Sequence, residues 1–160
     1  MTTDRNMTRA HAAPEPVGLY QPFIINGRLL AASAISSARD GRLVSGKLGR
    51  DLDLEAGQGA ARNAAENLLA VILDAVEGDQ SRIEQILFVR GYVNAAEDFP
   101  LVHKVIDAAS EVLIERLGDR GRHARTALGC ATLPNNNAVT LEATVVLTEA
   151  AAPMADSSQG

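Results

Sequence analysis

Apolar residues recur at three- and four-residue steps in two stretches of the chain, and this spacing predicts two amphipathic α-helices. In the first stretch the apolar positions are Ala61, Ala65, Leu68, Ile72 and Val76. Asp53 precedes them as the expected N-cap, and Gly78 follows them as the expected C-cap. Gly57 and Gly59 destabilise the first turns of this helix, so we expect either fraying or a tight backbone contact there.

The second helix is expected to begin after Asp98 as its N-cap, with Pro100 in its first turn, and to end at Gly118. Its buried face is predicted to comprise Val102, Ile106, Ala109, Leu113 and Leu117.

Runs of β-branched and other apolar residues predict the strands. Residues 23–25 and 29–32 flank Asn26-Gly27, a dipeptide that favours the two-residue turn of a β-hairpin. Residues 86–89 open a continuous apolar strand that reaches Val93, as expected for a central strand covered by helices on one face.

Turn residues mark the remaining strand ends. Asp40-Gly41 predicts a turn before a short strand at Leu43-Val44. Closer to the C-terminus, an apolar strand that begins near Arg125 and a β-rich run at 138–147 lie on either side of Asn135-Asn136-Asn137. We therefore expect these two runs to pair as a C-terminal β-hairpin.

The order of strands, helix, strand, helix and two strands predicts an α+β fold, a mixed β-sheet with two long helices on one face. The strands do not alternate cleanly between apolar and polar residues, so we expect the second face to be buried by self-association. Residues 17–148 form the predicted domain. Residues 1–16 and 149–160 are rich in Ala, Pro, Ser, Thr and charge without periodicity and are expected to be flexible tails.

The amino-acid composition of the chain argues against several classes of function. The net charge is −5, lysine occurs only at Lys47 and Lys104, and aromatic residues make up 3% of the chain, so a nucleic-acid-binding surface is not expected. The single Cys130 excludes an intramolecular disulfide and a cysteine-based zinc site. His103 and His123 lack the partners of a metal site; we expect His123 to be packed or hydrogen-bonded and His103 to be exposed.

The N-terminal segment has no apolar signal core, and the longest apolar block, residues 68–76, is too short to cross a bilayer. Together with the lone cysteine this predicts a cytoplasmic protein without membrane contact.

Arg125 is an isolated cation at the start of an apolar strand, and two roles are open for it. A planar guanidinium on a rigid strand can hold a carboxylate through two charge-assisted hydrogen bonds. The alternative is a structural ion pair.

The segment around Arg125 resembles the RidA/YjgF family, the reactive-intermediate deaminases. The residues that fit the family pattern in order are Gly118, Gly121, His123, Ala124, Arg125, Ala127, Gly129, Leu133 and Pro134. Gly18-Leu19-Tyr20 is similar to the family's Gly-Pro-Tyr, and Asp98-Phe99 is similar to its Asp-Phe. The likeness covers nearly all of residues 17–147.

The resemblance implies a chorismate-mutase-like α+β fold, a homotrimer and three pockets between subunits. In such a pocket Arg125 would bind a substrate carboxylate, with Tyr20 and the turn at Ser33-Ala34 nearby. It also implies hydrolysis of imines or enamines, such as 2-aminoacrylate, to 2-keto acids and ammonia without a metal or an organic cofactor.

Two departures from the family pattern bear on this chemistry. Ser33-Ala34-Ile35 stands where the family has Ser-Gly-Gln, so a Cβ is added where the backbone would approach the ligand. Thr140 stands where active members carry a glutamate, and a hydroxyl cannot act as a general acid or base near neutral pH. Glu142 lies on the same strand face but is displaced by roughly 7 Å, and it is interpreted either as a relocated acid or as an ion-pair partner.

Two hypotheses remain from the sequence. The first is a cofactor-free imine or enamine deaminase in which Arg125 holds the carboxylate and water is activated by Glu142, Thr140 or backbone groups. The second is a non-catalytic trimer that binds a small carboxylate metabolite or regulates a partner. A third activity attached to relatives, that of a ribonuclease or translation inhibitor, is disfavoured by the acidic charge balance.

Overall fold

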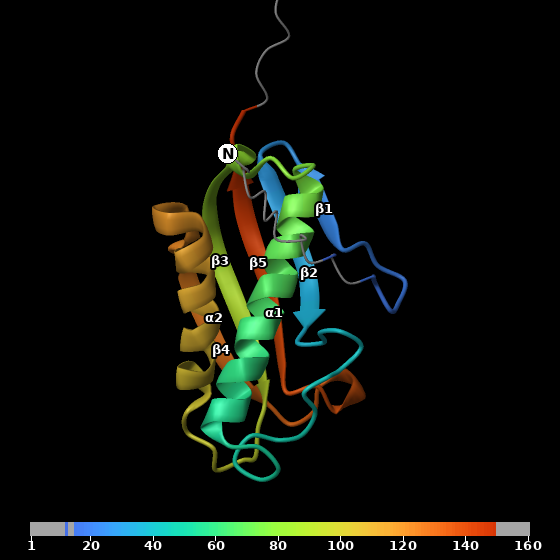
Figure 1. Cartoon of the computed structure of the whole chain (residues 1–160), viewed down its shortest axis with the longest axis vertical. Coiled ribbons are helices and arrows are strands. Elements are labelled where there is room, and N and C mark those ends of the chain that lie inside the picture. The colour runs from blue at the N-terminus through green and yellow to red at the C-terminus, as the bar shows by residue number, and fades with distance from the viewer. Residues whose placement is uncertain (1–11, 13–14, 150–160) are drawn as a thin grey trace, which may run out of the picture.

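A five-stranded mixed β-sheet carries two long helices on one of its faces (Figure 1). The computed structural model describes residue 12 and residues 15–149, so most of the two predicted tails lies outside the described residues. The regular elements are β1 (Phe23–Asn26), β2 (Leu29–Ser36), α1 (Leu54–Ala75), β3 (Ile83–Asn94), α2 (Val102–Leu117), β4 (Ala124–Cys130) and β5 (Val139–Leu147). Short 3₁₀ helices are η1 (Gln80–Arg82), η2 (Gly118–Gly121) and η3 (Pro134–Asn136). The predicted α+β fold with both helices on one face is confirmed.

The sheet order is β1-β2-β5-β3-β4, and this corrects the predicted C-terminal hairpin. β4 and β5 do not pair with each other; β3 lies between them, parallel to β4 and antiparallel to β5. The reason is the path of α2, which returns the chain to the start of β3, so that the next strand runs in the direction of β3. The segment after β4 then crosses the end of β3 and enters β5 on its other side.

The N-terminal hairpin is confirmed, with its turn shifted by one residue. Asn26 pairs with Leu29, so the two turn residues are Gly27 and Arg28 rather than Asn26-Gly27. Gly27 has a φ of 61°, which an L residue adopts only at a cost.

The turn at Asp40-Gly41 is also confirmed, because both residues have positive φ and Arg39 pairs with Arg42 across it. The predicted strand at Leu43-Val44 is wrong. These residues instead lie beside the segment that precedes β5, where the carbonyl of Val44 accepts a hydrogen bond from the N–H of Ala138.

Helix α1 begins as predicted, but its C-cap is Val76, two residues before the predicted Gly78. Asp53 Oδ1 accepts a hydrogen bond from the N–H of Ala56 at 2.8 Å, which is the expected N-cap. At the other end Glu77 adopts the left-handed conformation, and Gly78 N–H bonds to the Leu73 carbonyl in a Schellman arrangement. Gly78, which also has a positive φ of 80°, therefore takes part in ending the helix but is not its C-cap.

The tight contact expected in the first turns of α1 occurs at Gly57 and not at Gly59. A Cβ on Gly57 would lie 2.5 Å from a methyl carbon of Leu48, whereas a Cβ on Gly59 would meet nothing within 4 Å. Gly57 thus lets the loop before α1 pack directly on the helix.

Helix α2 begins later than predicted. Its first residue is Val102 and its N-cap is Leu101, which offers no side-chain hydrogen bond, so Asp98 is not the cap. Pro100 contributes to the delay, because it disfavours the helical region for Phe99, so the helix cannot begin directly after Asp98. The predicted end at Gly118, with a φ of 63°, is confirmed.

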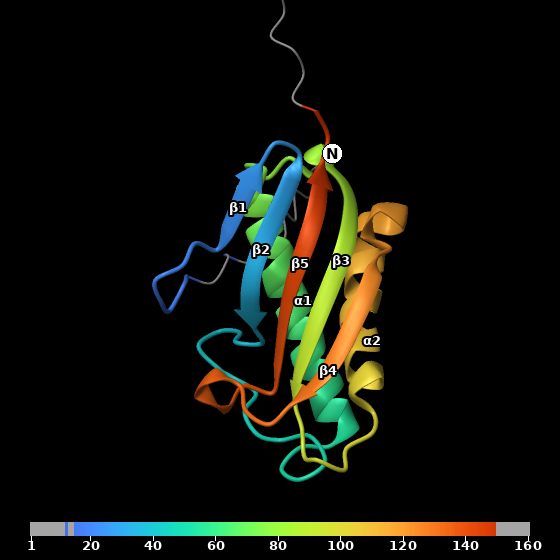
Figure 2. The same cartoon turned by 180° about the vertical axis from the view of Figure 1, so that it is seen from behind.

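The core lies between the sheet and the two helices, and the opposite face of the sheet is uncovered in the single chain (Figure 2). On β5 the residues alternate strictly, with Val139, Leu141, Ala143, Val145 and Leu147 buried toward the helices. The residues between them, including Thr140 and Glu142, belong to the uncovered face. Within residues 15–149 no helix is long and apolar enough to span a membrane.

Candidate functional site

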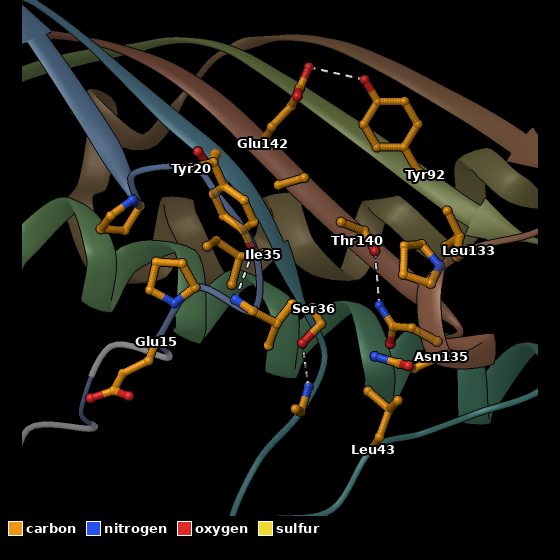
Figure 3. Close-up of a pocket in the computed structure, with 18 residues that line it drawn as sticks. Glu15, Tyr20, Ile35, Ser36, Leu43, Tyr92, Leu133, Asn135, Thr140 and Glu142 are labelled. Atoms are coloured by element: carbon orange, nitrogen blue, oxygen red, sulfur yellow. Dashed lines mark hydrogen bonds between the residues drawn. The ribbon is translucent and has the colours of Figure 1, made fainter.

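A cavity of about 690 Å³ opens on the uncovered face, where the end of β2 and the start of β5 meet the N-terminal segment and η3 (Figure 3). Its walls include five of the six residues that the sequence singles out: Tyr20, Ser33, Ala34, Thr140 and Glu142. The remaining surface is largely apolar, with side chains such as Pro16, Leu43 and Leu133. Arg125 does not line this cavity within one chain.

A β-bulge in β2 forms one wall of the cavity. The register of β2 on β5 shifts between Ala32 and Ile35, which places Ser33 and Ala34 out of the regular alternation. Ser33 uses its hydroxyl to donate to the carbonyl of Gln21 at 2.6 Å, so it ties the N-terminal segment to the sheet. Ala34 does not adopt a positive φ, so its Cβ causes no backbone strain and simply adds apolar surface to the wall.

Thr140 is held by a buried asparagine. Asn137 Nδ2 donates to Thr140 Oγ1 at 2.8 Å and to the Val139 carbonyl at 2.6 Å, while its Oδ1 accepts from Ser37 Oγ at 2.7 Å. Ser37 and Asn137 are both almost fully buried. Because Thr140 accepts through its oxygen, its hydroxyl hydrogen is available to donate to a water or a ligand in the cavity.

Glu142 is anchored from β3. Its Oε1 accepts hydrogen bonds from the Tyr92 hydroxyl at 3.0 Å and from Arg90 Nη1 at 3.3 Å, and Figure 3 shows the Tyr92 contact at the rim of the cavity. Arg90 also lies over the ring of Phe88, 4.6 Å from its centroid. Desolvation and the hydrogen bond to Glu142 raise the pKa of Tyr92, so the phenol stays protonated and remains a donor.

The ion-pair interpretation of Glu142 is therefore realised within the chain, through Arg90. This ion pair leaves the second carboxylate oxygen available, because Oε2 has no hydrogen-bond partner within the described residues. Glu142 can still bond a water or a ligand that enters the cavity.

Arg125 lies on the opposite face of the sheet, on the edge strand β4. Its Nη1 contacts Asp107 Oδ1 and Ser110 Oγ, both on α2 and both at 3.0 Å. In the register, Val89 faces Arg125 on one side and Ala143 on the other, and Ala143 belongs to the helix-covered side. Within one chain Arg125 is thus separated from Thr140 and Glu142 by β3 and by the sheet itself.

Asp107 and Arg125 form a half-exposed ion pair. The Arg125 side chain is 23% exposed and that of Asp107 is 40% exposed. Desolvation acts to raise the pKa of Asp107, but the hydrogen bond and the charge of Arg125 outweigh it, and the pKa is lowered. Asp107 is therefore ionised at neutral pH. The ion-pair role that the sequence left open for Arg125 is present, and it leaves Nε and Nη2 of the guanidinium without a protein partner among the described residues.

His123 supports the same cluster, as the expected hydrogen-bonded residue at the strand start. Its Nδ1 lies 2.6 Å from the Gly121 carbonyl and its Nε2 lies 3.0 Å from Ser110 Oγ. Burial lowers its pKa, more than the hydrogen bond to Gly121 raises it, and the charge of Arg125 lowers it further. The imidazole is neutral at pH 7. His103 is exposed on α2, as expected.

The sequence reasoning assigned no site role to Arg90, Tyr92, Asp107, Ser110 or Asn137, which the structure places at these two sites. Tyr92 and Asn137 lay inside segments interpreted only as strand and turn. A signal existed for Ser110, because it follows Asp107 by three residues and so shares a helical face with it. No group of three or more His, Cys, Asp or Glu side chains that could hold a metal ion occurs in residues 15–149.

Comparison with known proteins identifies the family. Residues 7–147 match the family described as YjgF/chorismate mutase-like, putative endoribonuclease. The chain is 33% identical over 138 residues to Protein TCP17 of Trypanosoma cruzi, covering 85% of this chain and 86% of that protein.

Several solved structures are also similar to this chain. Atu1372 of Agrobacterium tumefaciens, a protein of unknown function, is 39% identical with a TM-score of 0.80, over 81% of this chain and 82% of that one. A putative endoribonuclease from Shewanella oneidensis is 30% identical with a TM-score of 0.82, over 86% and 91% of the two chains. The YjgF gene product of E. coli, at 19% identity and a TM-score of 0.60 over 87% and 98%, shares the fold. The chain belongs to the YjgF/chorismate mutase-like family, the family that its arginine-containing C-terminal segment resembles.

Proposed function

We propose that this protein is a homotrimer that binds a small carboxylate metabolite, such as a 2-imino or 2-keto acid, at each junction between subunits. Arg125 of one subunit holds the carboxylate, and the cavity of the neighbouring subunit encloses the rest of the ligand. Thr140 and Glu142 face the reacting carbon, and Tyr20, Ser33 and Ala34 form the wall.

The charge of the cavity carries this proposal. None of its described lining residues is a lysine, an arginine or a histidine, whereas Glu15 and Glu142 are acidic. A carboxylate cannot enter such a cavity with favourable electrostatics unless a cation comes from elsewhere. Arg125 sits on an edge strand, and its Nε and Nη2 have no partner in the described part of the chain, so a second copy of the chain can supply this cation to the cavity.

The uncovered sheet face supports assembly. Phe88 and Thr144 lie opposite each other on this face, and neither helix covers it. A mixed surface of this kind is typical of a contact between subunits rather than of a core. Soluble homo-oligomers in general have closed point-group symmetry, and a cyclic trimer is one such arrangement.

A second candidate function, deamination, is favoured by one observation: Glu142 Oε2, at the rim of the cavity, has no hydrogen-bond partner among the described residues. In that reaction water adds to the imine carbon, its proton passes to the nitrogen, and ammonia leaves as the keto acid forms. Glu142 would accept the proton of water and return it to the leaving nitrogen, with Thr140 donating a hydrogen bond to either. Neither step requires a metal or an organic cofactor.

The experiment has a binding arm and a turnover arm. For binding, 2-oxobutanoate is titrated into the protein and into Arg125→Ala; we expect saturable binding that Arg125→Ala weakens by at least tenfold, because a charge-assisted bidentate contact is lost. Equal affinity of both proteins would refute the carboxylate role. For assembly, sedimentation should give three chains per particle, and a stable monomer with the same affinity would contradict the shared pocket.

For turnover, a pyridoxal enzyme generates 2-aminoacrylate or a longer imine, and keto-acid release is followed with and without the protein. Acceleration that disappears in Glu142→Gln supports deamination. Binding without any acceleration leaves the protein as a non-catalytic carboxylate-binding trimer. Thr140→Glu is the complementary variant, and a gain of activity would locate the acid that the chain lacks.

A further inference from the structure

We propose that Asp107 is a specificity-determining residue of the Arg125 site: because it shares the guanidinium with the ligand, it favours ligands with one negative charge over ligands with two. This inference rests on the proposed function, in which Arg125 holds the ligand carboxylate.

The free edge of Arg125 defines where a ligand binds. Nη1 carries two hydrogens, and it contacts two oxygens, Asp107 Oδ1 and Ser110 Oγ, each at 3.0 Å. Nη1 is therefore engaged by the protein, so the edge formed by Nη1 and Nη2 cannot hold a ligand carboxylate through both nitrogens. What remains is the edge formed by Nε and Nη2, which matches the two oxygens of one planar carboxylate.

The guanidinium is held in this orientation by a directed hydrogen-bond chain. Arginine only donates, so Ser110 Oγ accepts from Arg125 and gives its own hydrogen to His123 Nε2. Nδ1 of His123 then carries the proton that is donated to the Gly121 carbonyl. Each member has one role in the chain, so Arg125 cannot turn its free edge away without breaking these bonds.

Asp107 places a negative charge across the guanidinium from the bound carboxylate. The two carboxylates would lie about 6 Å apart, and at that distance near a protein surface two like charges repel enough to weaken binding several-fold. The second carboxylate of a dianionic ligand adds a further repulsion by Asp107, weaker because it lies farther away, to the repulsion by Glu142 in the cavity that encloses it. Lys104 Nζ, 3.5 Å from Asp107 Oδ2, offsets part of the charge from the solvent side.

The test compares two probes of the same length. 2-Oxopentanoate and 2-oxoglutarate have the same five-carbon chain, but the second carries a carboxylate where the first carries a methyl group. Their dissociation constants are measured by calorimetry for the wild-type trimer, for Asp107→Asn and for Glu111→Gln. Asparagine keeps the Oδ1 acceptor of the Arg125 hydrogen bond and removes the charge. Glu111→Gln removes one charge from the same helix at a side chain that faces Arg62 instead.

We expect the wild-type protein to bind 2-oxopentanoate about fivefold to tenfold more tightly than 2-oxoglutarate. Asp107→Asn should lower this ratio by about twofold and leave the part that comes from Glu142 in the cavity, whereas Glu111→Gln should keep the wild-type ratio. Lys104→Gln should increase the ratio, because it removes the cation that offsets Asp107.

The outcomes separate this inference from the proposed function. If both probes bind with an affinity that depends on Arg125 but Asp107→Asn leaves their ratio unchanged, the specificity role of Asp107 is overturned and the carboxylate site stands. If neither probe binds the wild-type protein, or if Arg125→Ala binds both as well as wild type, the proposed function is overturned and this inference with it.

Discussion

The cavity around Thr140 and the cluster around Arg125 are built on opposite principles. Thr140 is fixed by a neutral network, in which Asn137 and Ser37 are buried and fully hydrogen-bonded. Arg125 is fixed by a half-exposed ion pair with Asp107 and a hydrogen bond to Ser110. A buried polar network is costly to break, whereas a screened ion pair contributes little to stability. We therefore expect changes at the first site to destabilise the fold and changes at the second to alter binding.

The largest effect is expected from Asn137→Ala. This change leaves the buried Ser37 hydroxyl and the Val139 carbonyl without the partner they now have, and the free energy of unfolding should fall by about 3 kcal/mol. Urea denaturation measures the loss. Asn135→Gly is the matched control: Asn135 is exposed with a φ of 55°, a conformation that glycine keeps, so stability should stay within about 0.5 kcal/mol of wild type.

Tyr92→Phe tests the border between the cavity and the charged residues on β3. It removes a half-buried hydroxyl together with the hydrogen bond to Glu142, and the expected cost is about 1 kcal/mol, smaller than that of Asn137→Ala. The same denaturation measurement applies. A loss as large as that of Asn137→Ala would mean that Glu142 belongs to the structural network rather than to the exposed rim.

These contrasts explain what could be predicted from the sequence. The helices and the first hairpin depend on local periodicity, caps and turns, so residues such as Asp53 and Gly118 marked their ends correctly. The pairing of β4 could not be foreseen in this way, because an apolar run does not name its neighbour and the path of α2 decides it.

The same limit applies to the sites. Resemblance pointed to Tyr20, Ser33, Ala34, Thr140 and Glu142, which the fold gathers around one cavity. It gave no hint that Arg125 faces α2, because the side of the sheet follows from the register with β3 and the partners Asp107 and Ser110 come from another element. Position in a motif identifies a residue type; only packing reveals which groups compete for it.

The Arg125 cluster should affect how stability depends on pH more than it affects stability at neutral pH. Burial lowers the pKa of His123 below its ordinary value of 6.5, so the unfolded chain binds a proton that the folded chain resists. Stability from this group is full above about pH 7 and decreases as the pH falls through 6.5 toward the folded pKa. Between pH 7.5 and 5, the thermal unfolding temperature should therefore fall more steeply for wild type than for His123→Gln, which cannot titrate. Parallel curves would show that His123 is not held in its neutral form.

Glu142→Gln should change stability least of all and is the most informative about chemistry. Its ion pair with Arg90 has both side chains partly exposed, at 30% and 44%, so its loss should cost at most about 0.5 kcal/mol. Glutamine keeps an oxygen that accepts from Tyr92 and Arg90, and it fills the same volume.

Glu84→Gln, a change of the same kind in an exposed pair with Arg28, is the control for charge alone. If the protein deaminates imines through Glu142, turnover should fall by at least a hundredfold in Glu142→Gln and stay unchanged in Glu84→Gln, while carboxylate binding is retained by both. Turnover that survives in Glu142→Gln would move the chemistry to Thr140 and ordered water. The two sites would then act together in ligand binding alone. Arg125, on one face of the sheet, would supply the cation, and the cavity on the other face would enclose the ligand.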